Sequence, residues 1–252
     1  MNPAWIEPDW PAPAGVRALS TLRSGGVSAA PYASLNLGGH VGDAPEAVAQ
    51  NRRTLAAAAG LPSEPAWLAQ IHGVEVVDLD AVRHQGTSGL PPPADSAFTR
   101  RVGRVCAILT ADCLPILLAA DSGDLVAAAH AGWRGLAGGV IEATVRALGV
   151  EPARLMAWLG PAIGPQHFEV GPEVRDALLQ GDLGAQEAFV PNARGRFMAD
   201  VAALARRRLV SLGVDRIYGG GHCTFSDGVR YFSHRRDGIT GRQATLIWLE
   251  AP

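Results

Sequence analysis

The sequence predicts a mixed α/β protein, a layered α+β sandwich whose sheets are mixed and partly antiparallel. Short apolar runs alternate with amphipathic segments along all 252 residues, which is typical of strands interleaved with helices. Residues 114–120 and 124–130 are apolar runs joined by the turn sequence DSGD, so they predict an antiparallel hairpin. No G-x-G-x-x-G follows a first strand, which argues against a dinucleotide-binding Rossmann fold.

Glycines and prolines delimit the other elements. An alanine-rich helix is expected over residues 45–59, because the segment begins with a proline and is followed by Gly60. Amphipathic patterns predict two more helices, and alternating or continuous apolar patterns predict strands. The expected helices cover 136–149 and 197–213, the expected strands cover 74–80, 104–110, 216–220 and 244–250, and a surface loop rich in glycine and proline covers 86–96.

Composition and charge exclude several classes of protein. With 22 basic and 24 acidic residues the net charge is -2, so no global positive field exists to hold a nucleic acid. The N-terminus lacks the pattern of a signal peptide, and Asp112 interrupts the longest apolar run, so we expect a cytoplasmic protein without a membrane span. Three cysteines are an odd number, which favours free thiols over a disulfide framework.

The predicted hairpin brings a thiol and an imidazole together. If the chain turns near Ser122 and Gly123, position 113 lies nearly opposite position 132, so Cys113 and His130 can meet across the two strands. His72 stands before a glycine at the start of a predicted strand, where a side chain can point into a cleft. Two imidazoles and a thiolate are a ligand set for zinc, and the remaining coordination position would hold a water whose pKa falls to about 7.

Other interpretations of the same residues stay open. A thiolate beside an imidazolium is also an activated nucleophile, so Cys113 could attack a substrate with His130 as its base and Asp112 nearby. A single buried cysteine can equally be a small core residue, which is our interpretation of Cys106. His222 and Cys223 are adjacent in a glycine-rich segment and would point opposite ways in a strand, so we expect no shared metal there. The other histidines are expected in solvated loops: His40, His84, His167 and His234.

Arginines beside glycines or turn residues are candidate anion ligands. Arg23 lies in TLRSGGVS, Arg52 in NRR, and Arg235 and Arg236 in FSHRRDG. A guanidinium binds phosphate through two parallel hydrogen bonds, although a solvated surface charge is the alternative for each. We expect Arg23 and at least one of Arg52 and Arg235 to face the cleft of the zinc site.

The order of motifs along the chain resembles that of the YfiH family, also called the laccase-domain or polyphenol oxidase family, which includes the peptidoglycan editing factor. The resemblance covers residues 16–249, with ADCLP and HAGWRG as its most specific motifs. The other motifs that carry it are TLRSGGVS, SLNLGGHVGD, NRR, QIHG, LGPAIG, FEVGPEV and RRDGITGR. The resemblance implies a single domain over residues 1–252, with residues 1–15 as an N-terminal extension.

The resemblance also implies the site. The histidine of QIHG, the cysteine of ADCLP and the histidine of HAGWRG would hold one zinc and carry catalysis, here His72, Cys113 and His130. The substrate or phosphate contacts would come from residues in the other motifs, namely Arg23, Asn36, Arg52 and Arg235. His234 and His222 depart from the family pattern, which puts only substrate contacts in doubt.

The laccase label can be tested by counting ligands. Multicopper oxidation needs many histidines, often as H-x-H pairs, and this chain has seven histidines and no such pair. Apart from Met1, only Met156 and Met198 could be axial ligands, and both are distant from Cys113 in sequence. Zinc is therefore favoured over copper.

Three functions remain open after this comparison. The first is a zinc-dependent purine nucleoside enzyme that phosphorolyses adenosine, inosine, guanosine and methylthioadenosine and also deaminates adenosine. The second is a Cys-His hydrolase of peptidoglycan precursors, and the third is a copper polyphenol oxidase or a non-catalytic metal-binding protein. Whether Cys113 is a ligand or a nucleophile separates the first two. The expected partners are a purine nucleoside and phosphate, and the expected state is a monomer or small homo-oligomer.

Overall fold

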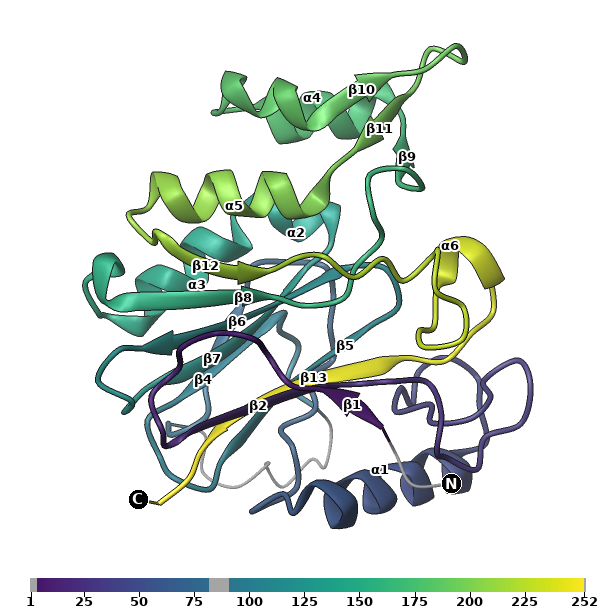
Figure 1. Ribbon diagram of the computed structural model, residues 1–252, viewed down its shortest axis with the longest axis vertical. Helices are drawn as coiled ribbons and strands as arrows, with labels where there is room; N and C mark the ends of the chain where they lie inside the picture. Colours follow the sequence, from purple (N-terminus) through teal and green to yellow (C-terminus); the bar gives the residue numbers. More distant parts are fainter. Residues whose placement is uncertain (1–3, 82–90, 252) are drawn as a thin grey trace.

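Helices and sheets stack in layers in the computed structural model, which describes residues 4–81 and 91–251 (Figure 1). Helix α1 (Pro45–Ala59) covers the outer face of a four-stranded sheet in the order β1-β2-β13-β5. A six-stranded sheet in the order β12-β8-β6-β7-β4-β3 lies behind it and is covered by α2, α3 and α5. A small sheet in the order β10-β11-β9 and helix α4 lie beyond α5.

The bounds of the elements follow the two main sheets. The four-stranded sheet contains β1 (Trp5–Ile6), β2 (Val16–Thr21), β13 (Gln243–Leu249) and β5 (Val105–Thr110). The six-stranded sheet contains β12 (Arg216–Gly219), β8 (Leu155–Leu159), β6 (Leu114–Ala120), β7 (Val126–Ala131), β4 (Ser96–Thr99) and β3 (Val76–Asp78). The remaining elements are α2 (Trp133–Gly138), α3 (Val140–Leu148), α4 (Pro172–Leu179), α5 (Val201–Ser211), α6 (His234–Asp237), β9 (Glu169–Val170), β10 (Phe189–Pro191) and β11 (Phe197–Ala199), with 3-10 turns at Pro152–Arg154 and Leu183–Ala188.

Alternating side chains of the strands fill the spaces between the layers. In β6, Leu117 packs between the two sheets while Leu118 packs against the helices, because successive residues of a strand face opposite ways. In β7, Ala128 likewise packs between the two sheets and Ala129 packs against the helices. A third cluster, including Leu55, lies under α1. Strands buried on both faces explain the continuous apolar runs of the sequence.

The predicted fold class is confirmed, and so is the central hairpin. Both sheets contain antiparallel pairs, while β12–β8 and β3–β4 are parallel. Strands β6 and β7 pair with Leu114 opposite Ala131, so position 113 is level with position 132 as the turn chemistry predicted. The turn contains Gly123 at φ 72, a left-handed conformation that glycine adopts without steric cost.

Several expected boundaries were wrong. The helix expected over 136–149 is two helices that begin at Trp133 and break at Gly139, whose φ is 96. The helix expected from residue 197 begins at Val201, because Asp200 caps it by accepting a hydrogen bond from the Ala203 amide. The strand expected over 74–80 is limited to Val76–Asp78.

The expected loop over 86–96 is also wrong at its C-terminal end. Residues 86–90 lie outside the described part of the chain, but Asp95 is fully buried and β4 begins at Ser96. His84 likewise falls outside the described residues, and His234 is the first residue of α6 rather than part of a loop. None of the described helices is long and apolar enough to cross a membrane.

Candidate metal centre

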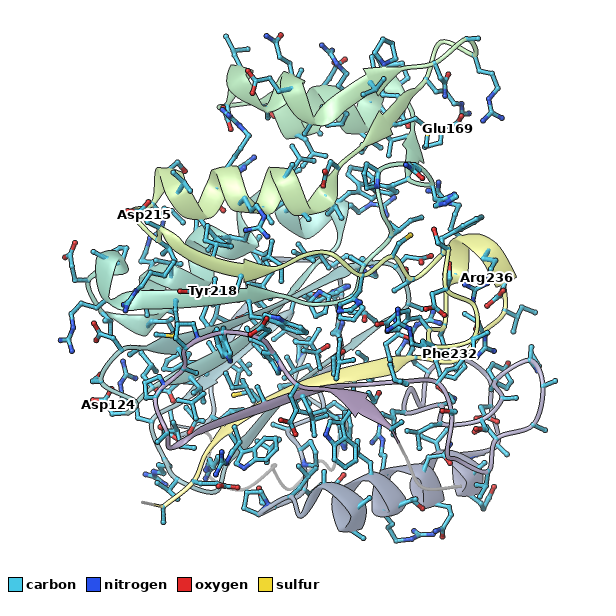
Figure 2. All side chains as sticks on the ribbon, viewed as in Figure 1. Asp124, Glu169, Asp215, Tyr218, Phe232 and Arg236 are labelled. Atoms are coloured by element: carbon cyan, nitrogen blue, oxygen red, sulfur yellow. The ribbon has the colours of Figure 1, made fainter. Side chains whose placement is uncertain are left out.

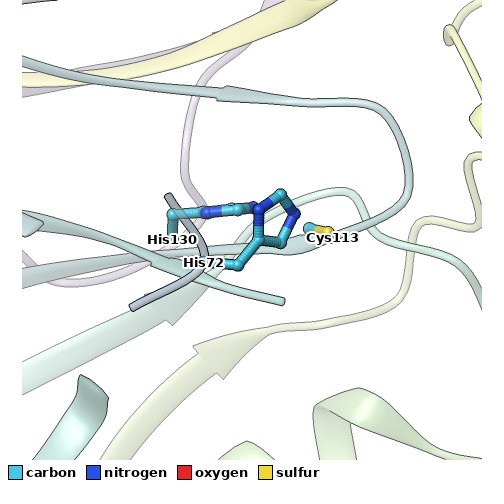
Figure 3. A group of neighbouring side chains, drawn as sticks. All are labelled: His72, Cys113 and His130. Atoms are coloured by element: carbon cyan, nitrogen blue, oxygen red, sulfur yellow. The ribbon is translucent and has the colours of Figure 1, made fainter. Parts of the chain in front are cut away.

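Three side chains from distant parts of the sequence converge at the end of the β6–β7 hairpin (Figure 3). One ligand atom each from His72, Cys113 and His130 lies within 4.8 Å of the others. The imidazole rings of His72 and His130 meet edge to face, with centroids 4.8 Å apart. Exposure falls from His72, which is exposed, through Cys113 to His130, which is buried, so the group is open on the His72 side.

The hairpin and a tight turn position these ligands. Cys113 immediately precedes β6, and His130 lies in β7 opposite Pro115. His72 adopts a φ of 59, so its backbone is in the left-handed region that few residues other than glycine occupy. The three ligands also close around Gly132, where a Cβ atom would come within 2.9 Å of His72 Cδ2 and 3.2 Å of Cys113 Sγ. Only glycine fits at position 132 without moving a ligand.

A buried carboxylate connects the two histidine segments. Asp95 accepts a 2.8 Å hydrogen bond from His130 Nδ1 and further bonds from the amides of Ile71, His72 and Gly73. Burial raises the pKa of Asp95, but the hydrogen bonds from His130 and these amides outweigh it and keep the carboxylate ionised. Because Nδ1 donates to Asp95, Nε2 of His130 is the nitrogen available to a metal.

Asp112 fixes the turn that carries Cys113. Its φ of 98 is unusual for a residue other than glycine. Its carboxylate accepts 2.6 Å hydrogen bonds from Thr224 Oγ1 and from the Arg235 amide, and its carbonyl accepts one from the Ile163 amide. Three separate segments therefore hold this backbone conformation in place. The sequence suggested Asp112 as a neighbour of a nucleophile, whereas its contacts are those of a positioning residue.

Cys113 and His130 shift each other's pKa towards the charged forms. Burial raises the pKa of Cys113, but the charge of His130 and hydrogen bonds from both histidines outweigh it and lower the pKa. Burial lowers the pKa of His130, yet the charge of Cys113 and the hydrogen bond to Asp95 raise it overall. The same environment suits a cation in place of the proton, because it supplies a thiolate and an anchored imidazole.

Donor chemistry is consistent with a bound metal. One thiolate sulfur and two imidazole nitrogens match the ligand types of zinc and of other borderline-soft metals. Asp95 supplies the outer hydrogen bond that metal-ligating histidines usually make. Within residues 4–81 and 91–251, this is the one group of three or more histidine, cysteine or acidic side chains placed to hold an ion.

Two of the candidate phosphate ligands are already engaged by the protein. Arg23 donates to the carbonyls of Ala33 and Gly228 and lies over the ring of Phe232. Arg235 donates through its side chain to the carbonyl of Glu169 and reaches the metal centre through its amide, which bonds Asp112. Phe232 and Glu169 are labelled in Figure 2, near α6 and β9 respectively. Arg235 is therefore tied to the turn that carries Cys113, whereas Arg23 is held by residues outside the group of three ligands.

Arg52 and Asn36 organise the loop over residues 36–43. Arg52 donates twice to the carbonyl of Leu37 and lies 4.1 Å over the ring of Trp67. Asn36 is fully buried, donates to Asp43 and accepts hydrogen bonds from the amides of Gly38 and Arg242. Since its polar atoms bond within the protein, the contacts of Asn36 are structural.

Sequence reasoning missed Arg242 and undervalued His40. Burial lowers the pKa of Arg242, while the negative charges of Cys113 and Asp112 raise it, so this guanidinium interacts electrostatically with the metal centre. The pKa of His40 is lowered by partial burial and by the charges of Arg242, Arg52, His72 and His130. The Arg242 Nη1 atom bonds the carbonyls of Thr240 and Gly241, and no protein partner is found for its Nε and Nη2 in the described part of the chain.

The comparisons with known proteins agree with this architecture. The family model for multi-copper polyphenol oxidoreductase laccase matches residues 17–250. A protein of Pseudomonas aeruginosa named as a purine nucleoside phosphorylase is 56% identical over 251 residues, which is 99% of this chain and all of that protein. The Escherichia coli purine nucleoside phosphorylase YfiH is 50% identical over 97% of this chain and 98% of its own length.

Solved structures give the same result for the fold. A Neisseria meningitidis protein superposes with a TM-score of 0.92 at 49% identity, covering 98% of this chain and 99% of that one. YlmD from Geobacillus stearothermophilus superposes with a TM-score of 0.90 at 33% identity, covering 98% of this chain and 96% of that one. The motifs, the layered sheets and the full-length matches together identify the chain as a member of the YfiH family.

Proposed function

We propose that this protein is a zinc-dependent purine nucleoside phosphorylase. The observation that carries the proposal is the group His72, Cys113 and His130, set in a chain that matches relatives named for this activity over their full length. The substrates we propose are adenosine, inosine, guanosine and methylthioadenosine, each with inorganic phosphate. Phosphorolysis yields the free base and ribose 1-phosphate.

The reaction needs phosphate held close to the ribose. One phosphate oxygen forms a bond to C1′ as the bond from C1′ to the base breaks, and the base leaves with that electron pair and takes up a proton. Within the described residues no protein partner is found for Nε and Nη2 of Arg242, whose guanidinium interacts with the charge of Cys113. His40 interacts with the charges of Arg52, Arg242 and both histidine ligands. We assign phosphate binding to Arg242, because a guanidinium offers two parallel donors to an anion.

Zinc bound by these three residues would supply Lewis-acid stabilisation of developing negative charge. Asp95 holds the ring of His130 and the turn of His72, so the two imidazoles keep their orientation as substrate enters. Asp112 holds the turn that carries Cys113, so the sulfur also keeps its position. Arg23, Arg235 and Asn36 act indirectly in this proposal, by holding the loops around the site.

Adenosine deamination is a second activity of the proposed site. It replaces the amino group at C6 of the purine by an oxygen from water and releases ammonia, so it requires the base rather than the ribose to face the metal ligands. His72 is the exposed member of the group, so a substrate can approach the group from that side.

A Cys-His hydrolase remains the second candidate, and one observation favours it. The contact between Cys113 and His130 lowers the pKa of the thiol and raises the pKa of the imidazole, which favours the thiolate and imidazolium forms of an activated cysteine nucleophile. In that reading the thiolate would attack a peptide or amide carbonyl of a peptidoglycan precursor. Metal dependence separates the two candidates, because zinc on the thiolate would block its attack.

Product analysis tests the proposal directly. The protein is incubated with adenosine, with and without phosphate, and adenine, inosine and ribose 1-phosphate are separated. We expect adenine and ribose 1-phosphate only with phosphate, inosine in both reactions, and neither product from Cys113→Ala. Cys106→Ala is the matched control, because it removes the same side chain from the core between the sheets. Base release that is equal without phosphate contradicts phosphorolysis.

A further inference from the structure

An open cavity lies on the helix side of the six-stranded sheet. Its volume is about 410 Å³, and it is lined by residues between 160 and 165 after β8, the start of α5 and the glycine-rich residues 220–223 after β12. Figure 1 shows α5 running alongside β12 above this sheet. Leu114 lines the cavity and packs toward the helices, so the cavity meets the strand that follows Cys113 from the side of the helices. Four ionisable side chains line it, namely Asp200, Arg206, His222 and Cys223.

Three of the four are unsuited to covalent chemistry. Asp200 accepts the Ala203 amide as the cap of α5, and Arg206 donates to the carbonyls of Ile217 and Gly219. Burial and the charge of Arg230 lower the pKa of His222, so its ring is neutral at pH 7. Cys223 is the nucleophile of the cavity.

The sulfur of Cys223 sits among hydrogen-bond donors. It accepts from the Gly164 amide at 3.2 Å, the Ser226 hydroxyl at 3.3 Å and the Ser226 amide at 3.4 Å. Burial raises the pKa of Cys223, but these hydrogen bonds outweigh it and lower the pKa. The side chain is half-buried, so the stabilised thiolate stays within reach of a small molecule.

The other two cysteines lack this combination. Cys106 is fully buried between the sheets, and burial strongly raises its pKa. Cys113 belongs to the candidate metal centre, where a bound cation would protect the sulfur. Cys223 therefore combines an open cavity, a stabilised thiolate and freedom from metal ligation.

We propose that Cys223 is a modification site that forms a mixed disulfide with a low-molecular-weight disulfide entering this cavity. The Cys223 thiolate attacks one sulfur of that disulfide, a new sulfur-sulfur bond forms, and the other half leaves as a thiolate that takes up a proton from water. The disulfide is the oxidant, so electrons and atoms balance without another reagent. The cavity volume admits a compact compound.

The modified segment is tied to the turn before Cys113. Residue 162 pairs with residues 222–224 through two backbone hydrogen bonds. The Ala162 amide donates to the His222 carbonyl, and the Thr224 amide donates to the Ala162 carbonyl. From there, Thr224 Oγ1 and the Ile163 amide both bond Asp112. A disulfide sulfur is a weaker acceptor than a thiolate, so modification weakens the bond from the Gly164 amide and loosens this connection.

Mass spectrometry with 2-hydroxyethyl disulfide as the probe tests the site. At neutral pH we expect one adduct per chain, on Cys223, which a thiol reductant removes and which Cys223→Ser abolishes. Ser226→Ala keeps the thiol and the amide donor but loses the hydroxyl donor, so we expect the adduct to form about three- to tenfold more slowly. An adduct that forms first on Cys113 or Cys106, or an unchanged rate in Ser226→Ala, overturns the proposal.

Amide hydrogen exchange tests the connection to Asp112 without reference to any catalytic activity. In the modified protein we expect the Gly164 and Ile163 amides to exchange about tenfold faster than in the unmodified protein, because opening of this segment costs less. The Leu118 amide, in the middle of β6, serves as the control and should not change. Equal exchange at Gly164 and Ile163 in both forms refutes the connection.

Discussion

Two thiols of this protein, Cys106 and Cys113, share a residue type and differ in chemistry. Cys106 is the second residue of β5 and lies between the two sheets, where apolar neighbours and complete burial raise its pKa. Cys113 lies in the turn immediately before β6, where the charge and hydrogen bonds of two histidines lower its pKa despite burial. The difference shows that the neighbours of a thiol, rather than its burial alone, decide its reactivity in this protein.

Replacing the two cysteines in turn gives the largest expected difference. We predict that Cys113→Ala loses bound zinc and lowers phosphorolysis by more than about a hundredfold, because loss of a direct ligand exceeds the effects typical of outer hydrogen bonds. Cys106→Ala should retain both zinc and activity. Metal analysis and the rate of ribose 1-phosphate formation measure the two effects, and equal zinc content in both variants contradicts the assignment of Cys113 as a ligand.

Asp95→Asn changes the hydrogen-bond partner of the ligands while leaving all three ligands in place. The amide cannot accept all four hydrogen bonds that the carboxylate accepts from His130 and from residues 71–73. We predict a 10–100-fold weaker zinc affinity, on the order usual for loss of a ligand's hydrogen-bond partner. Competition titration with a chelator measures it, with Asp124→Asn, on the distant β6–β7 turn, as the control. An affinity unchanged in Asp95→Asn disproves the positioning role.

Arg242→Gln tests whether the missed arginine holds phosphate. The variant should raise the KM for phosphate by about tenfold, the effect expected from losing a charge-assisted hydrogen bond, with little change in the KM for adenosine. Arg154→Gln removes a charge from an exposed ion pair with Asp121 and is the matched control. If the KM for both substrates rose equally in Arg242→Gln, the residue would be a general structural support instead.

Gly132→Ala gives the smallest expected effect at the site. The added methyl group meets His72 Cδ2 at 2.9 Å, and the exposed His72 side chain can move by a few tenths of an ångström. We predict about a fivefold loss of zinc affinity, close to ~1 kcal/mol of local overpacking. Gly221→Ala, where a Cβ meets nothing within 4 Å, should leave the affinity unchanged. A larger loss in Gly221→Ala than in Gly132→Ala would point to general destabilisation.

Much of this site could be predicted because it depends on a regular element. The turn sequence after residue 120 sets the register of β6 and β7, and that register places Cys113 beside His130. Asp95 could not be found this way, because it follows a proline-rich segment that predicts a surface loop, and its burial depends on turns far away in sequence. Arg242 reaches the site through the pairing of β13 with β5 and β2, which no local pattern reveals.

The helix boundaries teach a related lesson. The break between α2 and α3 lies at Gly139. The apolar pattern continues through this residue, so periodicity alone predicts one continuous helix. At α5 the residues before Asp200 continue the apolar pattern, yet they form β11 and pair with β9 and β10. Tertiary pairing decided the conformation there, and the cap residue was the one local signal of the true start.

Removing and restoring the metal tests the central claim most directly. The measurement is the rate of ribose 1-phosphate formation from adenosine and phosphate by the metal-free protein and by the same sample after one equivalent of zinc is added. Because His72, Cys113 and His130 provide the proposed ligands, we predict negligible activity without metal and recovery with zinc. Full activity in the metal-free protein would contradict a zinc phosphorylase and leave the thiolate of Cys113 as the reactive group.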